Sequence, residues 1–371
     1  MVLEEGASAT CGEHVSNLIG RSGNVLVVMD PALVALGIAE PTLTSLRESG
    51  HSVSVFSDLT SDPKESAVDA GTALAHANET DCVVGIGGGS ALDTAKLIAA
   101  LAHTGEVCGP YSLCAKPLPY RRTAVIAVPT TSGTGSETTG VSIVSDASGA
   151  KNWFAGHSLY ADLALMDPKM TVGLPSYWTL YTGLDALVHA IESRTNKNAN
   201  ASNNPTAEHA ISLAAQHLKT AITDGSNIAA RAGMMESAAF GGLAIANTGC
   251  SVAHCIGHAL GSLAGIPHGR AVSIGIVASL EWAVEGDREG FERVAEVMGL
   301  SGPMSIADFF HRMAEAGGET LALTDEERAH LSLDKLSYEM TIPANDVILH
   351  AASRVPEPGD AAMLAGRVLA A

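Results

Sequence analysis

The chain is poor in charge and in aromatic side chains. Charged residues make up 16% of its 371 residues, and acidic side chains outnumber basic ones by 40 to 21, for a formal net charge of −19. No basic stripe is available to attract nucleic acid or an anionic membrane, so neither partner is expected. Aromatic residues are only 4% of the chain, which offers little π-surface to a flat ring substrate.

Targeting signals and long apolar runs are also missing from the sequence. A run of about 18 apolar residues, as a transmembrane helix needs, does not occur. The N-terminus, MVLEEGASAT, has early glutamates and no positive segment, unlike a secretory signal. The cysteines are few and scattered, at Cys11, Cys82, Cys108, Cys114, Cys250 and Cys255. We therefore expect a reduced, cytoplasmic protein.

The N-terminal half alternates two kinds of segment between about residues 24 and 167. Short β-branched runs, each expected to be a strand buried on both faces, are NVLVVMD, HSVSVF, DCVVGIGGG, TAVIAVPT and ADLALMD. Alanine-rich segments of helical length lie between them, including DPKESAVDAGTALAHANE and SALDTAKLIAALAHTG. This alternation predicts a parallel sheet with crossover helices.

The strand signal ends after Pro175, and only helical patterns follow. One stripe consists of Ile211, Ala214, Leu218 and Ile222 at helical spacing. Farther along, Thr324 and Glu327 predict a capping box at the start of a late helix. A chain of this length and 46% hydrophobic content is expected to form two domains. Proline and glycine in DPKMTVGLPSYW place the boundary there, giving an α/β domain over 1–175 and an all-helical domain over 176–371.

Four side chains in the helical half form a candidate metal site. Asp185 and His189 are an i, i+4 pair on one helix face in GLDALVHAIES, while His254 lies in SVAHCIGHALG and His268 in GIPHGRAV. A single histidine among 14 is more often a packing or surface residue. One carboxylate with three imidazoles is instead a ligand set suited to Fe(II) or Zn(II).

His258 lies one helical turn after His254 and should share its face. It can be a fifth ligand, a proton relay or a packing residue. We favour the relay, because four ligands already complete the protein's share of an open catalytic site. Cys250 and Cys255 are interpreted as helix-packing residues near the metal.

The glycine-rich segment GIGGGSALDTAK follows a predicted strand and opens a helix. Gly87, Gly88 and Gly89 remove Cβ obstruction, so that amides at a helix N-terminus can approach a pyrophosphate. Ser90 can donate a hydroxyl or cap the helix, but it occupies the third glycine position of the strict dinucleotide fingerprint. Asp30 ends the first strong strand. A carboxylate there can accept hydrogen bonds from the ribose hydroxyls and repel a 2′-phosphate, which favours NAD over NADP. Ordinary glycine turns and strand-end aspartates remain the alternative.

A second candidate cradle is VPTTSGTGSETTGVSIVSD, after the strand ending at Val128. Thr130, Thr131, Thr134 and Thr139 are its candidate donors for phosphate, ribose or carboxamide groups. A polar surface turn is the alternative. Ligands collect at the carboxyl ends of strands in open parallel sheets, which favours the binding interpretation.

A divalent ion and a nicotinamide together indicate one kind of chemistry. The ion lowers the pKa of an alcohol or polarises a carbonyl, and hydride passes to or from the nicotinamide. His258 would carry the proton to solvent. The residues therefore predict an NAD(H)-linked alcohol dehydrogenase or aldehyde reductase.

The four motifs resemble the iron-containing (group III) alcohol dehydrogenase family. GGGSALDTAK, PTTSGTGSE, GLDALVHAIE and HCIGHALGSLAGIPHG look like its signature blocks, and the likeness covers roughly residues 20 to 285. The resemblance implies a dinucleotide-binding α/β domain, an all-helical domain and a homodimer or higher homo-oligomer. It implies that Asp185, His189, His254 and His268 bind the metal, with Fe(II) expected first and Zn(II) possible. It adds Lys151 to the nucleotide contacts Asp30, Gly89, Ser90, Thr130, Thr131 and Thr139, and matches His258 to the family's extra active-site histidine.

Several positions depart from the family pattern. The chain lacks most of the first strand, and its tail after about residue 335 does not match the usual ending. Val141 and Ile245 are atypical substrate-side residues. Arg270 occupies a position that is often aliphatic, and it either pairs with an anionic substrate group or, as the favoured interpretation, forms a structural ion pair.

Other functions compete with the alcohol dehydrogenase prediction. A maleylacetate-reductase or glycerol-dehydrogenase type is disfavoured by the intact set of Asp and three His. A dehydroquinate-synthase-like lyase would need a basic anion pocket and a glutamate ligand, neither of which is found. A non-catalytic nucleotide-binding protein is disfavoured by the complete ligand set.

Overall fold

The computed structural model describes residues 1–60 and 62–370. The chain divides into two compact units. The first comprises residues 1–131 and 135–173, and the second comprises residues 132–134 and 174–371. The sequence-based boundary at 175/176 lies two residues beyond this division.

Among the described residues, the first unit contains the strands, five α-helices and five short 3-10 helices. Its strands are β1 (Val2–Leu3), β2 (Asn24–Met29), β3 (Ser52–Phe56), β4 (Cys82–Gly87), β5 (Ala124–Pro129), β6 (Val141–Ser145), β7 (Lys151–Ala155) and β8 (Leu163–Met166). Its α-helices are α1 (Cys11–Ile19), α2 (Pro31–Ala35), α3 (Glu40–Glu48), α4 (Glu65–Ala77) and α5 (Gly89–Leu101). Short 3-10 helices are η1 (Ala7–Thr10), η2 (Gly109–Cys114), η3 (Ser136–Thr138), η4 (His157–Leu159) and η5 (Pro168–Thr171).

Six parallel strands form the central sheet in the order β1-β8-β5-β4-β2-β3. Alternation along β2 sends its side chains to opposite faces of the sheet. Val25 and Val27 join one hydrophobic cluster with α1 and α3, whereas Leu26 and Val28 join another with α4 and α5. The predicted parallel α/β fold is confirmed, with one hydrophobic cluster on each face of the sheet.

Two details of the sheet differ from the sequence-based expectation. HSVSVF forms β3 at the edge of the sheet, where Ser52 and Val55 are exposed, so its predicted burial on both faces is wrong. The first strand is only the pair Val2–Leu3, in line with the expectation that most of it is missing. The antiparallel hairpin β6–β7 was not predicted, because VSIVSD was interpreted as part of a polar loop.

The strand order fixes where ligands can collect on this unit. From β2 the chain runs outward to β3 and then returns to the opposite side of β2 to form β4, which pairs with it in parallel. The carboxyl ends of β2 and β4 therefore flank a topological switch point, the usual ligand site of open α/β sheets. Asp30 follows β2 and the Gly87–Gly89 segment ends β4.

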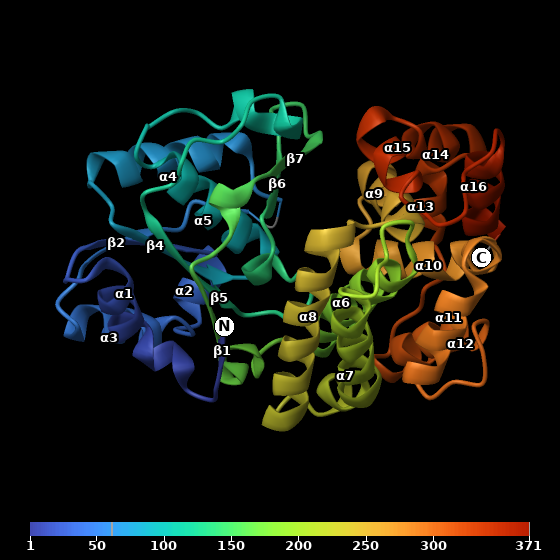
Figure 1. Cartoon of the computed structure of the whole chain (residues 1–371), viewed down its shortest axis with the longest axis horizontal. Helices are drawn as coiled ribbons and strands as arrows, with labels where there is room; N and C mark the ends of the chain where they lie inside the picture. The colour runs from blue at the N-terminus through green and yellow to red at the C-terminus, as the bar shows by residue number, and fades with distance from the viewer. Residues whose placement is uncertain (61, 371) are drawn as a thin grey trace. The chain divides into compact units, whose positions relative to one another are not determined.

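The second unit is built from helices. They are α6 (Ser176–Thr195), α7 (Asn204–Thr223), α8 (Ile228–Thr248), α9 (Val252–Ala264), α10 (His268–Gly286), α11 (Arg288–Val297), α12 (Ser305–Ala316), α13 (Asp325–His330), α14 (Leu333–Met340), α15 (Pro343–Leu349) and α16 (Asp360–Ala370). The long helices α6, α7 and α8 pack against one another (Figure 1). The predicted stripe on α7 is buried, and Thr324 and Glu327 form the predicted capping box on α13.

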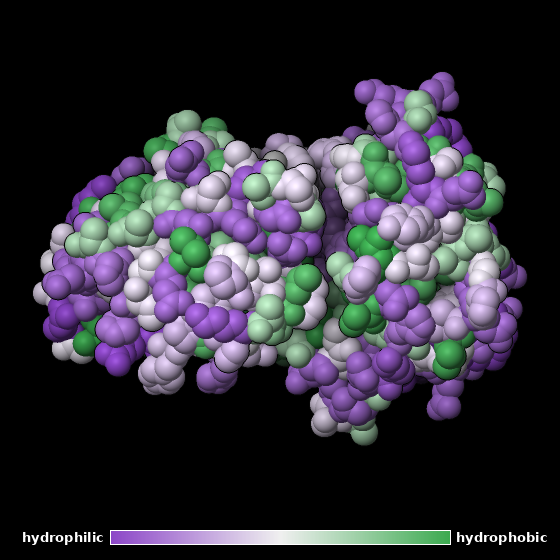
Figure 2. Space-filling view, turned by 90° about the horizontal axis from the view of Figure 1, so that it is seen from above, coloured by the Kyte–Doolittle hydropathy of each residue, from purple (hydrophilic) through white to green (hydrophobic). Residues whose placement is uncertain are grey.

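The surface is predominantly polar in the view of Figure 2, with apolar residues in small patches among hydrophilic ones. All six cysteines are described and carry free thiols. Within residues 1–60 and 62–370, no single helix combines the length and apolar character needed to cross a membrane. The bent pair α8 and α9, at 103° to each other, meets that test by length and composition when taken together.

Candidate metal centre

The structure brings the four predicted metal ligands together. The Oδ1 atom of Asp185 lies 3.8 Å from Nε2 of His189, 3.6 Å from Nε2 of His254 and 3.5 Å from Nε2 of His268. Asp185, His189 and His254 are buried, while the side chain of His268 is 36% exposed. The ligand set therefore has three enclosed members and one that solvent can reach.

These separations suit a small divalent ion. Ligands at about 2.0–2.2 Å from a tetrahedral ion lie about 3.3–3.6 Å from one another, close to the observed spacing. Both Asp185 Oδ1 and His254 Nε2 are buried and have no hydrogen-bond partner. Because an unsatisfied buried polar atom is costly, these two atoms indicate that the site is built for a ligand that both can bind. The donor set fits Fe(II) or Zn(II).

Helix geometry accounts for the placement of the ligands. Asp185 and His189 are four residues apart on α6 and share one face. His268 is the first residue of α10, after Pro267. A Cβ atom on Gly269 would clash with the carbonyl oxygen of Tyr181, so glycine permits α10 to approach α6 closely at this point.

Glu192 orients one of the ligands. Its Oε2 atom lies 2.7 Å from Nδ1 of His254 and accepts the backbone N–H of Ser251 at 2.8 Å, while Oε1 accepts the N–H of Ala253 at 2.6 Å. A carboxylate at Nδ1 holds the proton on that nitrogen and leaves Nε2 to bind an ion. The same carboxylate satisfies orphan amides at the N-terminus of α9. Sequence analysis missed this role, although Glu192 lies in the GLDALVHAIE motif.

The charged groups of the site shift the pKa values of three of its side chains. Burial alone would raise the pKa of Asp185, but the neighbouring imidazoles outweigh it and leave the pKa well below the ordinary value. Burial would lower the pKa of His254, but Cys250, Glu192 and Asp185 raise it. The pKa of His189 is raised in the same way, against burial, chiefly by Asp185. Proton and metal ion therefore compete for the same nitrogens.

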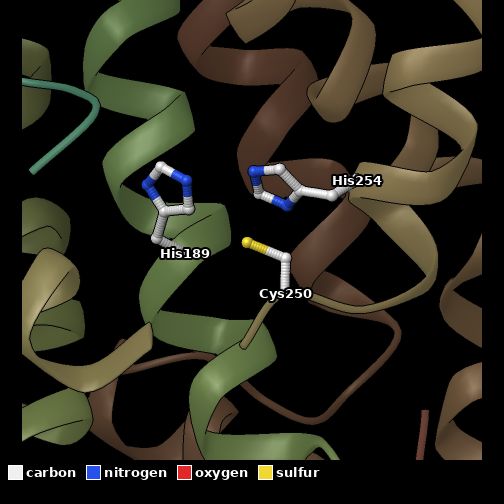
Figure 3. Close-up of side chains that lie close together, drawn as sticks. All are labelled: His189, Cys250 and His254. Atoms are coloured by element: carbon white, nitrogen blue, oxygen red, sulfur yellow. The ribbon is translucent and has the colours of Figure 1, made fainter. Parts of the chain in front are cut away.

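Cys250 lies beside two of the ligands. Figure 3 shows its sulfur between the imidazoles of His189 and His254, which stack with ring centroids 4.6 Å apart. Burial alone would raise the pKa of the thiol, but His254 and His189 lower it to about 7. Cys255, by contrast, points its thiol to the carbonyl of Met340 at 3.4 Å. The packing interpretation therefore describes Cys255 but is incomplete for Cys250.

His258 is next to the same cluster. Its ring centroid lies 6.1 Å from that of His254 and 5.6 Å from that of His268. Its Nδ1 atom is 3.3 Å from Oδ1 of Asn345, whose own Nδ2 donates to the carbonyl of Glu339. That second hydrogen bond fixes the amide so that its oxygen accepts from His258. Asn345 belongs to the tail that sequence comparison did not match.

Most of the predicted nucleotide residues follow the carboxyl ends of β2, β4 and β5. Asp30 follows β2 and caps α2 by accepting the N–H of Ala32 at 2.7 Å. Gly88 caps α5, and a Cβ on it would lie 3.3 Å from Oγ1 of Thr131. Thr130 follows β5 and donates its N–H to the carbonyl of Gly87. The remaining members of the predicted set are Gly89 and Ser90 at the start of α5, Thr139 before β6, and Lys151 at the start of β7. Thr134 alone is grouped with the second unit.

A buried lysine holds the second cradle in place. Lys96 on α5 is fully buried, and its Nζ atom donates to the carbonyls of Ser136 at 2.9 Å, Thr139 at 3.3 Å and Val141 at 2.5 Å. It also pairs with Asp93 at 3.1 Å. Burial lowers the pKa of Lys96, and Asp93 opposes that shift. Both residues lie in GGGSALDTAK, but sequence analysis assigned them no role.

The structure corrects one substrate candidate. The guanidinium of Arg270 is buried and bonds to the carboxylate of Glu327 and to the carbonyls of Thr320 at 3.1 Å and Ala322 at 2.6 Å. Four of its five N–H groups bond within the protein, which supports the structural ion pair over a contact with an anionic substrate. Val141 is an exposed residue at the start of β6, and Ile245 is half-buried on α8.

Comparisons with known proteins agree with the motifs. The sequence matches the family profile described as iron-containing alcohol dehydrogenase over residues 1–168 and the C-terminal profile of the Fe-containing alcohol dehydrogenase family over residues 179–327. The chain belongs to the iron-containing alcohol dehydrogenase family. These matches support an iron-type alcohol dehydrogenase function.

Relatives and solved structures extend this likeness. Long-chain-alcohol dehydrogenase 1 of Geobacillus thermodenitrificans is 37% identical over 253 residues, which span 68% of this chain and 64% of the relative. Choline dehydrogenase of Bacillus subtilis is 35% identical over 298 residues, 80% of this chain and 74% of the relative. The crystal structure of sulfoacetaldehyde reductase from Bifidobacterium kashiwanohense in complex with NAD+ superposes with a TM-score of 0.86 at 26% identity, covering 98% of this chain and 94% of that one.

Proposed function

We propose that this protein is a metal-dependent, NAD(H)-linked alcohol dehydrogenase that also acts as an aldehyde reductase. The observation that carries the proposal is the buried, unpartnered Oδ1 of Asp185 within 3.8 Å of three imidazole nitrogens. Asp185, His189, His254 and His268 would hold the ion, with Fe(II) preferred because of the family and Zn(II) as the alternative. When bound, the ion supplies a Lewis acid that stabilises negative charge on a substrate oxygen.

The residues around the ligands have separate tasks in this proposal. Glu192 keeps the proton on Nδ1 of His254, and Asn345 orients the ring of His258. His258 is the candidate proton carrier, since its ring lies beside the ligand cluster but has no place among the four ligands. Val141 and Ile245 remain candidate substrate neighbours.

NAD(H) is the proposed cofactor of the first unit. A nicotinamide supplies the hydride acceptor or donor when bound. Asp30 and the Gly87–Gly89 segment flank the switch point of the sheet, where the helix N-terminus and open backbone suit a pyrophosphate. Thr130, Thr131 and Thr139 add hydroxyl groups on the neighbouring loop, and Ser90, Thr134 and Lys151 complete the proposed contacts. The NAD+ complex of the related sulfoacetaldehyde reductase supports this choice of cofactor.

Small alcohols and aldehydes are the proposed substrates. The commitment of Arg270 to Glu327 removes the one argument for an anionic substrate at that position. We also propose a homodimer or higher homo-oligomer, which the family resemblance supports. A cytoplasmic location is proposed because all six cysteines are free thiols.

Chelation tests the proposal directly. Purified protein with NAD and a panel of small alcohols should form NADH, lose that activity after metal removal, and regain it when Fe(II) or Zn(II) is added. Asp185→Asn should not be rescued by either ion, whereas Asp308→Asn, at an exposed site on α12, should behave as wild type. NADH formation that resists chelation would contradict the metal role. Cyclisation of a substrate without net NADH would support the lyase alternative, and an inert protein would support simple nucleotide binding.

A further inference from the structure

The position of Cys250 gives the metal centre a sulfur neighbour. Cys250 lies in the short connection between α8 and α9, directly after Gly249, whose φ of 78° is in the left-handed region. This connection carries the thiol to the space between α6 and α9. Figure 3 shows the sulfur lying beside the facing rings of His189, on α6, and His254, on α9.

Two ligand groups overlap at this point. In one group, the candidate ligand atoms of Asp185, His254 and His268 lie within 4.8 Å of one another. In the other, those of His189, Cys250 and His254 lie within the same limit. His254 belongs to both groups, whereas Cys250 belongs to the second and His268 to the first. The two groups can therefore be separated by mutation.

An unpartnered nitrogen belongs to the second group as well. Nε2 of His254 is buried without a hydrogen-bond partner, and His254 is 2% exposed. In a tetrahedral site with metal–sulfur and metal–nitrogen bonds of about 2.3 Å and 2.0–2.1 Å, these donors lie about 3.6 Å apart. Closing from 4.8 Å or less to about 3.6 Å requires the donors to approach one another by about 1.2 Å at most. A cysteine in a connection between helices can make that adjustment.

We propose that Cys250 is a metal ligand, which with His189 and His254 forms a second, sulfur-containing set for a soft divalent ion. The inference rests on the proposed metal-dependent function, because it adds a ligand to the same centre. Binding exchanges the thiol proton for a metal–sulfur bond, and the proton leaves to solvent. No electrons move, so the ion stays in the divalent state.

The second set gives the centre a preference for Zn(II) over Fe(II), which Asp185 and His268 alone do not supply. Thiolate with two imidazoles is a ligand combination typical of Zn(II) and of its spectroscopic substitute Co(II), whereas a carboxylate with imidazoles suits Fe(II) as well. Zn(II) should therefore bind more tightly when Cys250 is a ligand, whereas Fe(II) should depend mainly on Asp185. Loss of the thiol should weaken Zn(II) binding by about tenfold or more and change Fe(II) affinity far less.

Cobalt spectroscopy on the intact, metal-free protein tests this ligand set. Titration with Co(II) should produce a thiolate-to-cobalt charge-transfer band in the near ultraviolet with wild type and with the matched control Cys255→Ser. Cys250→Ser should still bind Co(II), as its visible d–d bands would show, but should lack the charge-transfer band. His268→Ala should keep the band, because His268 belongs only to the other group.

The outcomes separate this inference from the proposed function. Wild-type protein that binds Co(II) without a charge-transfer band overturns the inference whatever the variants do, and so does a band that survives in Cys250→Ser. Those results would leave alcohol oxidation by the Fe(II) enzyme intact. A Cys250-dependent band in a protein that never forms NADH would support the sulfur ligand and count against the proposed function. Competition between Zn(II) and a chelator gives the affinity ratio of wild type and Cys250→Ser independently of activity.

Discussion

Replacing Glu192 by glutamine tests how the protein prepares His254 for metal binding. Glu192 is buried, and its two oxygens accept from Nδ1 of His254 and from the backbone amides of Ser251 and Ala253. Glutamine has nearly the same shape but replaces one of these oxygens by an NH2 group. That group must face either the imidazole and Ser251 or the backbone N–H groups of Ala253 and His254. The first orientation costs less, because the imidazole can change its tautomer whereas a backbone amide always donates.

The size of the effect follows from these contacts. With the amide nitrogen toward His254, the imidazole is driven to the tautomer that carries its proton on Nε2, the atom needed for the ion. Loss of such a supporting carboxylate costs about 10–100-fold in metal affinity, or about 1.4–2.8 kcal/mol. A buried amide left facing a donor adds about 1–3 kcal/mol of lost folding stability. We therefore expect a folded, less stable protein whose metal affinity falls by one to two orders of magnitude.

The assay measures metal affinity apart from activity. Metal-free wild type and Glu192→Gln are titrated with Zn(II) or Fe(II) against a competing chelator, and urea unfolding is followed in parallel. Glu208→Gln is the matched control, because Glu208 pairs with Arg194 and Arg293, both at 2.9 Å, and not with a metal ligand. It should change stability without changing metal affinity. If folded Glu192→Gln binds the ion as tightly as wild type, the orienting role of Glu192 is refuted.

Two further predictions concern buried cations, one in each unit. Arg270→Met should lower the free energy of unfolding by about 2–4 kcal/mol, because Glu327 and two carbonyls lose their charged donor, and it should reduce kcat/KM for neutral and acidic aldehydes to the same degree. A loss confined to acidic aldehydes would restore the substrate role that the structure disfavours. Lys96→Met should loosen the segment from Ser136 to Val141, weakening NAD binding by about tenfold or more while leaving Zn(II) affinity unchanged. Calorimetric titration with NAD and with Zn(II) checks both halves of that prediction, and unaltered NAD affinity would contradict it.

Hydrophobic pattern was a sufficient guide to the fold where strands and helices are buried. NVLVVMD became β2 because its residues face packed helices on both sides, and the stripe on α7 was found by helical spacing. The same composition could not reveal position within the sheet. HSVSVF resembles a buried strand by residue type, but pairing on one side only left β3 at the edge. The hairpin β6–β7 was missed because β6 follows directly on a segment rich in serine, threonine and glycine, which resembles a loop.

Sequence spacing predicted the metal ligands better than their surroundings. Asp185 and His189 are related by one helical turn, which spacing expresses directly. Glu192, Cys250 and Asn345 contribute through contacts between different elements, and no local pattern carries that information. For Glu192 a signal existed, since it lies one further turn along α6 from His189. For Arg270 the residue type allowed either a substrate contact or a structural ion pair, and only its bond to Glu327 distinguishes the two.

The arrangement of Glu192 couples the metal centre to the folding of α9. One carboxylate serves the ring of His254 and the first amides of the helix that carries it, so the ligand cannot be oriented unless the helix has begun correctly. The four ligands, Glu192 and Cys250 all belong to the second unit. Ion affinity should therefore depend on the packing of α6, α9 and α10, whereas nucleotide affinity depends on strand ends of the first unit. This division explains why a substitution such as Lys96→Met can weaken one property without the other, and why both must be measured before a loss of alcohol oxidation is assigned to either.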